Sequence, residues 1–143
     1  MLESHKVRIM KELSPDIVEN LVAAAKQAQK NAYAPYSNFK VGAAVLTPGG
    51  DVYRGCNVEN ASYGLTICAE RNAVFQAVAS GEKEITALAI VTDAEEPSPP
   101  CGACRQVLVE FASDIPIILK SLNGKRVIKS LDDLLPHRFH LEE

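Results

Sequence analysis

The chain has 143 residues, is 47% hydrophobic and carries a formal net charge of −3. This length suits one domain, spanning residues 1–143, with a sizeable core. The sequence has no apolar run of about 18 residues that would span a membrane, no Lys/Arg cluster typical of nucleic-acid binders and no apolar secretory segment near its start. We therefore expect a cytoplasmic protein whose partner is a free small molecule, not a nucleic acid or a membrane.

The first third of the chain predicts one helix and a hairpin. Ser14 and Pro15 form an N-cap followed by proline at the first helical position, and apolar residues continue at helical spacing to about Asn31. Strands are expected at 41–46 and 52–56, because the residues between them, Pro-Gly-Gly-Asp, are typical of a hairpin turn.

The middle of the chain contains two short cysteine motifs, each at the start of a predicted helix. A loop over 57–67 leads into Cys68-Ala69-Glu70, where apolar residues at helical spacing begin and continue until Gly81 stops the helix. A continuously apolar segment, 86–92, is typical of a central strand buried on both faces. After a proline-rich loop, Pro100-Cys101-Gly102-Ala103-Cys104 opens a helix over about 102–112.

The last part of the chain decides the topology. Strands at 115–120 and 126–128 are joined by Asn123-Gly124, a tight turn that can link only antiparallel strands. A short helix over 131–135 ends before Pro136. The whole order of elements predicts a single three-layer α/β/α domain with a mixed five-stranded sheet whose last strand is antiparallel.

The two cysteine motifs together indicate a catalytic zinc site. Cys68, Cys101 and Cys104 are one ligand short of a closed tetrahedral site, and a catalytic zinc keeps the fourth position open for water. Glu70 lies two residues after a candidate ligand, where a carboxylate can transfer protons. The combined pattern is the known signature of zinc nucleobase deaminases. Arg71 is a candidate to offset the charge of three thiolates.

Other interpretations of these residues remain open at this point. Cys56 as a fourth ligand would make the zinc structural, as in an interaction module, and Cys101 with Cys104 alone would suit a thiol redox protein. Separately, Glu70 could merely favour the first turn of its helix electrostatically, and Arg71 could be an ordinary surface residue.

The chain resembles cytidine deaminases of the small, tetrameric kind, from residues 34–44 to residues 134–139. The most specific matches are Asn57-Val58-Glu59-Asn60-Ala61-Ser62-Tyr63, Cys68-Ala69-Glu70-Arg71 and Pro100-Cys101-Gly102-Ala103-Cys104-Arg105-Gln106. The resemblance implies hydrolysis of cytidine and 2'-deoxycytidine to the uridines with release of ammonia, a reaction of pyrimidine salvage. It also implies one Zn²⁺ per chain on the three cysteines, with Glu70 as the proton shuttle.

The resemblance further implies how the substrate is bound. Asn57 and Glu59 would hydrogen-bond the ribose hydroxyls, and Phe39 would pack on the base. Without the resemblance, Asn57 and Glu59 could equally be ordinary polar residues of a loop, and an aromatic residue before a strand, such as Phe39, is more often part of the core. The rest of the implied substrate-binding set comprises Ala69 and three residues that would reach a neighbouring subunit's site in a homotetramer: Ala61, Tyr63 and Phe139.

Blasticidin-S deaminases share the zinc motifs and the small size, so a modified cytosine nucleoside remains an alternative substrate. The segment 57–63, together with Phe39 and Phe139, fits the plain nucleoside better.

Overall fold

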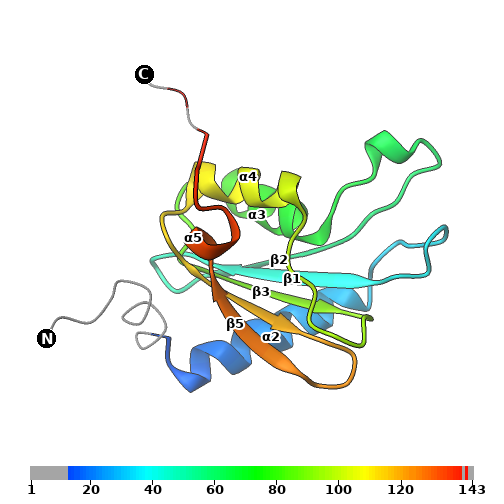
Figure 1. Ribbon diagram of the computed structural model, residues 1–143, viewed down its shortest axis with the longest axis horizontal. Coiled ribbons are helices and arrows are strands. Elements are labelled where there is room, and N and C mark those ends of the chain that lie inside the picture. The colour runs from blue at the N-terminus through cyan, green and yellow to red at the C-terminus, as the bar shows by residue number, and fades with distance from the viewer. Residues whose placement is uncertain (1–12, 140, 142–143) are drawn as a thin grey trace, which may run out of the picture.

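A five-stranded sheet forms the middle layer of the protein, as seen in the computed structural model (Figure 1). The structure describes residues 13–139 and residue 141, so the predicted domain limits at residues 1 and 143 lie outside the described residues. The elements are α2 (Pro15–Gln29), β1 (Val41–Leu46), β2 (Val52–Cys56), the 3₁₀ helix η1 (Tyr63–Leu65), α3 (Ala69–Ala79), β3 (Ala87–Thr92), α4 (Gly102–Phe111), β4 (Pro116–Lys120), β5 (Arg126–Ser130) and α5 (Leu131–Leu134).

The sheet has the strand order β2-β1-β3-β4-β5. Strand β1 pairs antiparallel with both β2 and β3, and Val41 lies opposite Thr92 in the second of these pairs. Strands β3 and β4 are parallel, and α4 supplies the crossover that such a pair needs. Strand β5 runs antiparallel to β4, so the prediction from Asn123-Gly124 is confirmed.

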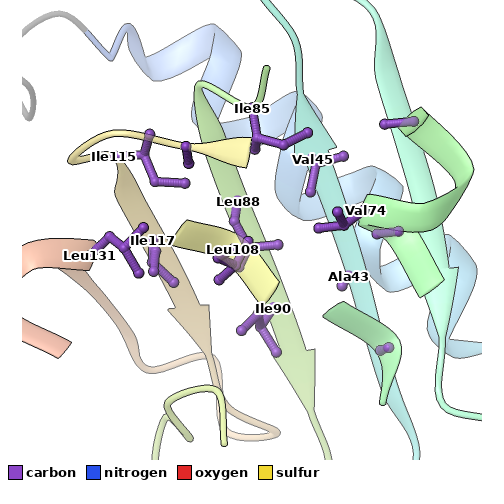
Figure 2. Close-up of a cluster of buried hydrophobic side chains, with 14 of the residues drawn as sticks. Ala43, Val45, Val74, Ile85, Leu88, Ile90, Leu108, Ile115, Ile117 and Leu131 are labelled. Atoms are coloured by element: carbon purple, nitrogen blue, oxygen red, sulfur yellow. The ribbon is translucent and has the colours of Figure 1, made fainter. Parts of the chain in front are cut away.

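Helices cover both faces of the sheet. Helix α2 packs on one face, and α3, α4 and α5 pack on the other (Figure 1). Figure 2 shows the larger of the two cores, in which Val74 from α3, Leu108 from α4 and Leu88 from β3 meet. All six residues of β3 are buried, which confirms the central strand predicted from its apolar run. The predicted three-layer arrangement is therefore present.

Local capping rules account for the start of α2. The Ser14 hydroxyl accepts a hydrogen bond from the Ile17 backbone N–H at 3.2 Å, and Pro15 occupies the first helical turn. The helix ends at Gln29, before the predicted Asn31, because the Asn31 N–H turns back to the carbonyl of Ala28. No helix in the described part of the chain has the length and apolar character that a membrane span requires.

Gly55 allows α3 to lie directly against β2. A Cβ atom at this position would be 2.3 Å from the backbone nitrogen of Ala73 and 2.6 Å from the carbonyl oxygen of Ala69. Both contacts are with helix backbone, which has no side chain to rotate away. The absence of a side chain at Gly55 therefore allows the short distance between α3 and β2. This distance in turn fixes the position of the residues in the first turn of α3.

We expect Gly55→Ala to destabilise the protein by about 1–3 kcal/mol, the usual cost of an overpacked core. Urea unfolding would measure the effect. Gly64→Ala is the matched control, because a Cβ atom there meets nothing within 4 Å. Equal unfolding midpoints for the two variants would contradict this account of the packing of α3.

Candidate active site

Three cysteine thiols meet where α3 and α4 begin. Cys68 is the N-cap of α3, Cys101 is the N-cap of α4, and Cys104 lies in the first turn of α4. The Cys68 and Cys101 sulfurs are 3.9 Å apart, the Cys101 and Cys104 sulfurs are 3.4 Å apart, and all three lie within 4.8 Å of one another. Neither N-cap thiol makes a capping hydrogen bond, so both sulfurs are available as ligands.

This donor set fits a zinc ion. Sulfurs about 2.3 Å from a tetrahedral zinc lie about 3.8 Å from one another, which is close to the observed spacing. Hydrogen bonding from Cys104, with a further contribution from Arg71, lowers the pKa of Cys68 to about 5, so this thiol is readily ionised for metal binding. Cys104 is the partner that retains the proton, and its pKa is raised.

A fourth protein ligand is absent from this cluster among the described residues. Cys56, the alternative candidate, does not belong to it, and burial raises the pKa of its thiol, which disfavours the thiolate form. Three protein ligands leave one position for water, as in catalytic and not structural zinc sites. The third thiol also makes a simple Cys101–Cys104 redox pair a poorer interpretation.

Glu70 lies beside the thiols without belonging to the ligand cluster. It occupies the first turn of α3 and is only 5% exposed. Burial raises the pKa of Glu70, and a hydrogen bond with Cys104 partly opposes this effect. A buried carboxyl group with a raised pKa holds a proton more readily than one in water, which suits a general acid or base. The predicted relation between Cys68 and Glu70 is therefore present in the structure.

The positively charged side chain of Arg71 contacts the thiol cluster. Its Nη2 donates a hydrogen bond to the Cys68 sulfur at 3.3 Å, and this bond raises the pKa of the guanidinium group. Its Nε is buried and has no hydrogen-bond partner among the described residues. The half-buried guanidinium thus lies against the thiol cluster.

The candidate ribose-binding segment is joined to the residue before Cys68. Val58 and Ile67 exchange two backbone hydrogen bonds of 3.0 Å each, which bring Asn57 and Glu59 next to the start of α3. On its other side the segment bonds to Tyr33, whose backbone donates to Asn57 O at 3.0 Å and accepts from Glu59 N at 2.9 Å. The loop is thereby held as a short extension of the sheet.

Asn57 and Glu59 hold the turn that carries Phe39. The Asn57 amide donates to Phe39 O at 2.8 Å and accepts from Val41 N at 2.9 Å. The Glu59 carboxylate accepts from the backbone of Tyr36 and Ser37 at 3.0 and 3.1 Å and from the Ser37 hydroxyl. These bonds, led by the Ser37 hydroxyl, lower the pKa of Glu59 and keep it ionised.

An open groove of about 350 Å³ is lined in part by Glu59, Ser37 and Tyr63. Tyr63 is 79% exposed and meets Tyr36 edge to face, with ring centroids 6.5 Å apart. The structure thus groups Phe39, Asn57 and Glu59 around one turn, next to the motif of Cys68.

The remaining predicted substrate residues have different surroundings. Ala69 is fully buried at the start of α3, whereas Ala61 is exposed in the loop before η1. Phe139 is 66% exposed in the C-terminal segment. Figure 1 shows the loop with η1 and the C-terminal segment extending from opposite ends of the helical layer.

Arg105 has a role that the sequence reasoning missed. Its Nε donates to the carbonyl of Pro100 and its Nη1 to the carbonyl of Leu134, each at 2.8 Å. It therefore ties the loop before Cys101 to the end of α5. The signals in the sequence are its position directly after Cys104 and its place in the motif 100–106, and neither indicates a bond to Leu134.

Comparison with known proteins agrees with this geometry. Residues 15–119 match the family model described as the cytidine and deoxycytidylate deaminase zinc-binding region. A cytidine deaminase of Sporosarcina psychrophila is 48% identical over 88% of this chain and 93% of its own length.

Solved structures give the same result. The crystal structure of cytidine deaminase from Burkholderia pseudomallei has a TM-score of 0.82 and 50% identity, and the match covers 85% of this chain and 98% of that one. The corresponding enzyme from Mycobacterium tuberculosis has a TM-score of 0.75 and 43% identity over 87% of this chain and 98% of its own. With three thiols placed for zinc and a buried glutamate beside them, the chain belongs to the cytidine deaminase family.

Proposed function

We propose that this protein hydrolyses cytidine and 2'-deoxycytidine to uridine and 2'-deoxyuridine with release of ammonia, as in pyrimidine salvage. The observation that carries the proposal is the meeting of three thiols at two helix N-termini, with the buried Glu70 beside them and outside the ligand cluster. The relatives described above are named cytidine deaminases, which supports the plain nucleoside and not blasticidin S as the substrate.

Cys68, Cys101 and Cys104 would hold the zinc ion. Such an ion supplies a Lewis acid that lowers the pKa of a water molecule to about 7. The backbone N–H groups at the starts of α3 and α4 and the Arg71 guanidinium stabilise the thiolates that this binding requires.

Glu70 would carry protons during the reaction. Its carboxylate accepts a proton from the attacking water and gives it to the ring nitrogen next to the reacting carbon. After the carbon–oxygen bond has formed, the same residue moves the proton of the new hydroxyl group to the amino group, so a carbonyl group forms as the carbon–nitrogen bond breaks and ammonia leaves. Glu70 suits these steps because it lies at the thiol cluster without coordinating the metal, and its burial favours the protonated form more than water would.

Asn57 and Glu59 would bind the ribose hydroxyls with the capacity that remains to them. One amide N–H of Asn57 donates to Phe39 O, and its amide oxygen accepts from Val41 N–H. Its second amide N–H remains available to donate to a ribose hydroxyl. A carboxylate has about four acceptor sites, and Glu59 uses three of them on Tyr36 and Ser37. Phe39 would pack on the base, and Ala69 would line the pocket at the start of α3.

We also propose a homotetramer in which Ala61, Tyr63 and Phe139 complete sites in neighbouring subunits. The support is their exposure, together with an exposed apolar surface formed by Val52 and Val58 beside the sheet edge and Phe75 of α3. Phe75 and Val58 line one shallow hollow of this surface. A second copy of the chain is the proposed occupant.

A cytoplasmic location is proposed on separate grounds. All four cysteines are free thiols, which persist in reducing compartments. The zinc ligands in particular need to remain reduced.

Glu70→Gln should keep zinc and fold while losing activity, because the amide preserves size but cannot accept the proton. Deamination of cytidine should fall by at least about 10²–10⁴-fold, the usual contribution of a general acid–base group. Ammonia release and zinc per chain are the measurements, and Glu110→Gln on the exposed face of α4 is the control. Near-normal turnover in a zinc-loaded Glu70→Gln protein would rule out the proton shuttle. Assaying blasticidin S beside cytidine tests the substrate.

Arg71→Gln should lower activity more than it lowers zinc content, because the thiolates would then keep a charge that weakens the metal as a Lewis acid. Both quantities can be measured on one preparation by metal analysis and ammonia release. Lys129→Gln removes an exposed cation from β5 and serves as the control. If Arg71→Gln leaves both quantities unchanged, the charge argument is wrong.

Phe75→Glu should dissociate the tetramer, because it places a charge in the proposed apolar contact, where loss of a central hot-spot residue costs about 2 kcal/mol or more. Sedimentation would show smaller species, and activity should fall with them because each site lacks its neighbour's residues. Leu122→Glu is the control, since Leu122 is 65% exposed beyond the end of β4. A wild-type chain that sediments as a fully active monomer is incompatible with this assembly.

A further inference from the structure

Two side chains that lie far apart in the sequence form hydrogen bonds with the backbone N–H and carbonyl groups of Lys40. The carboxylate of Asp93 accepts a hydrogen bond from the Lys40 N–H at 2.9 Å, and the side-chain amide of Gln29 donates to the Lys40 carbonyl at 3.0 Å. The same amide nitrogen also donates to the Asp93 carboxylate at 3.1 Å. We call Gln29 and Asp93 the Lys40 clamp.

The clamp lies just beyond the end of the pairing between β1 and β3, where no further backbone hydrogen bonds of the sheet hold the chain. Val41 opposite Thr92 is the last β1–β3 pair, and Asp93 directly follows Thr92. The Asp93 side chain therefore accepts the hydrogen bond from Lys40 N–H at a point where a longer β3 would offer a backbone carbonyl group. On the other side of β1, Asn57 follows β2 and bonds Phe39 O and Val41 N in the same manner. The segment from Phe39 to Val41 is held from both sides.

The turn before this segment needs such support. Asn38 has φ of 57°, in the left-handed region that few residues other than glycine adopt. The next backbone N–H, of Phe39, donates a hydrogen bond to the Ser37 hydroxyl at 3.0 Å, which spans this left-handed residue. A sparsely populated conformation persists when its surroundings fix it. The side chain of Phe39 is thus directed by bonds on both of its flanks.

The clamp depends on the chemical identity of both residues. The Gln29 amide nitrogen has two hydrogens, one for Lys40 O and one for Asp93, and the Asp93 carboxylate offers one oxygen to each of its two N–H donors. An amide in place of this carboxylate would turn an N–H₂ group toward one of these donors. The bonds to a carboxylate are also stronger than those to a neutral acceptor.

We propose that Asp93, held by Gln29, is a positioning residue that sets the place of Phe39 in the substrate site. The inference rests on the proposed function, in which Phe39 packs on the base. Asp93 acts through the backbone of Lys40 and neither touches the substrate nor belongs to the zinc cluster. Its loss therefore weakens substrate binding and leaves the proton transfers by Glu70 intact.

The test is Asp93→Asn, which keeps the size of the side chain and removes one acceptor. We expect KM for cytidine to rise about tenfold, the effect of one lost hydrogen bond to a charged group, with kcat changed less than about twofold. Zinc per chain should remain near that of the wild type, and the urea midpoint should fall, because the bonds of the clamp also stabilise the fold. Glu96→Gln is the control, because Glu96 pairs with Lys125 and makes no bond to the clamp. An unchanged KM in Asp93→Asn, or a loss confined to kcat or zinc, overturns the proposal.

A double-mutant cycle with Phe39→Ala separates positioning from general stability. If Asp93 acts through Phe39, Asp93→Asn should raise KM little further once the ring is gone. Full additivity of the two effects overturns the proposal. Should Asp93→Asn fail to fold, Gln29→Ala replaces it in the cycle, since it removes two bonds of the clamp and leaves the one from Lys40 N–H to Asp93.

The same assays keep this inference distinct from the proposed function. Wild-type protein that fails to release ammonia from cytidine would sink the proposed function. Normal wild-type turnover with a KM that depends on Phe39, but not on Asp93, would sink the positioning role alone.

Discussion

The gathering of three thiol groups within 4.8 Å is the constraint on which the rest of the structure depends. Two unit charges 4 Å apart repel by about 4 kcal/mol at an effective dielectric constant of 20, so three thiolates do not collect unaided before a metal arrives. The fold supplies the compensation by starting two helices at ligand cysteines and by placing Arg71 on the Cys68 sulfur. Gly55 and Arg105 serve the same end, because they fix α3 on the sheet and the loop before Cys101.

The position of Glu70 is a consequence of this arrangement, but its carboxylate would add a further negative charge beside the thiols. A helix that begins at Cys68 places the residue two positions later in its buried first turn, beside sulfurs that are already electron-rich. Burial and nearby thiolate charge both favour the protonated carboxyl group, which raises its pKa. The proximity that makes Glu70 difficult to ionise is also what a proton carrier requires. The positive charge of Arg71 limits this effect, so one cation serves the ligands and the carboxylate together.

The features that the sequence could predict depend on residues close together in the chain. The Ser14 cap, the Asn123-Gly124 hairpin and the two cysteine motifs each follow from a few neighbouring residues, and the structure contains them all. The bonds that hold the site do not: Gln29 and Asp93 are 64 positions apart, and Arg105 and Leu134 are 29 apart. Such pairs form only when the register of the sheet is set, so no pattern of neighbouring residues in the sequence predicts them. The limits of the elements shifted for a similar reason, since β5 extends to Ser130 through its pairing with Pro116.

The aromatic residues assigned to substrate binding are held in two different ways. Phe39 is fixed by its own chain, because the backbone on either side of it forms hydrogen bonds with Asn57, Ser37 and the Lys40 clamp. Phe139 is held at its backbone by the side chain of Gln106 at 3.2 Å, and its ring is largely exposed. In the proposed site, the ring of Phe39 would be in place to contact the base even in an isolated subunit, whereas the exposed ring of Phe139 would need a second surface to pack against. In the proposed tetramer a neighbouring subunit supplies that surface, so base recognition would be set by the fold and closure of the site by assembly.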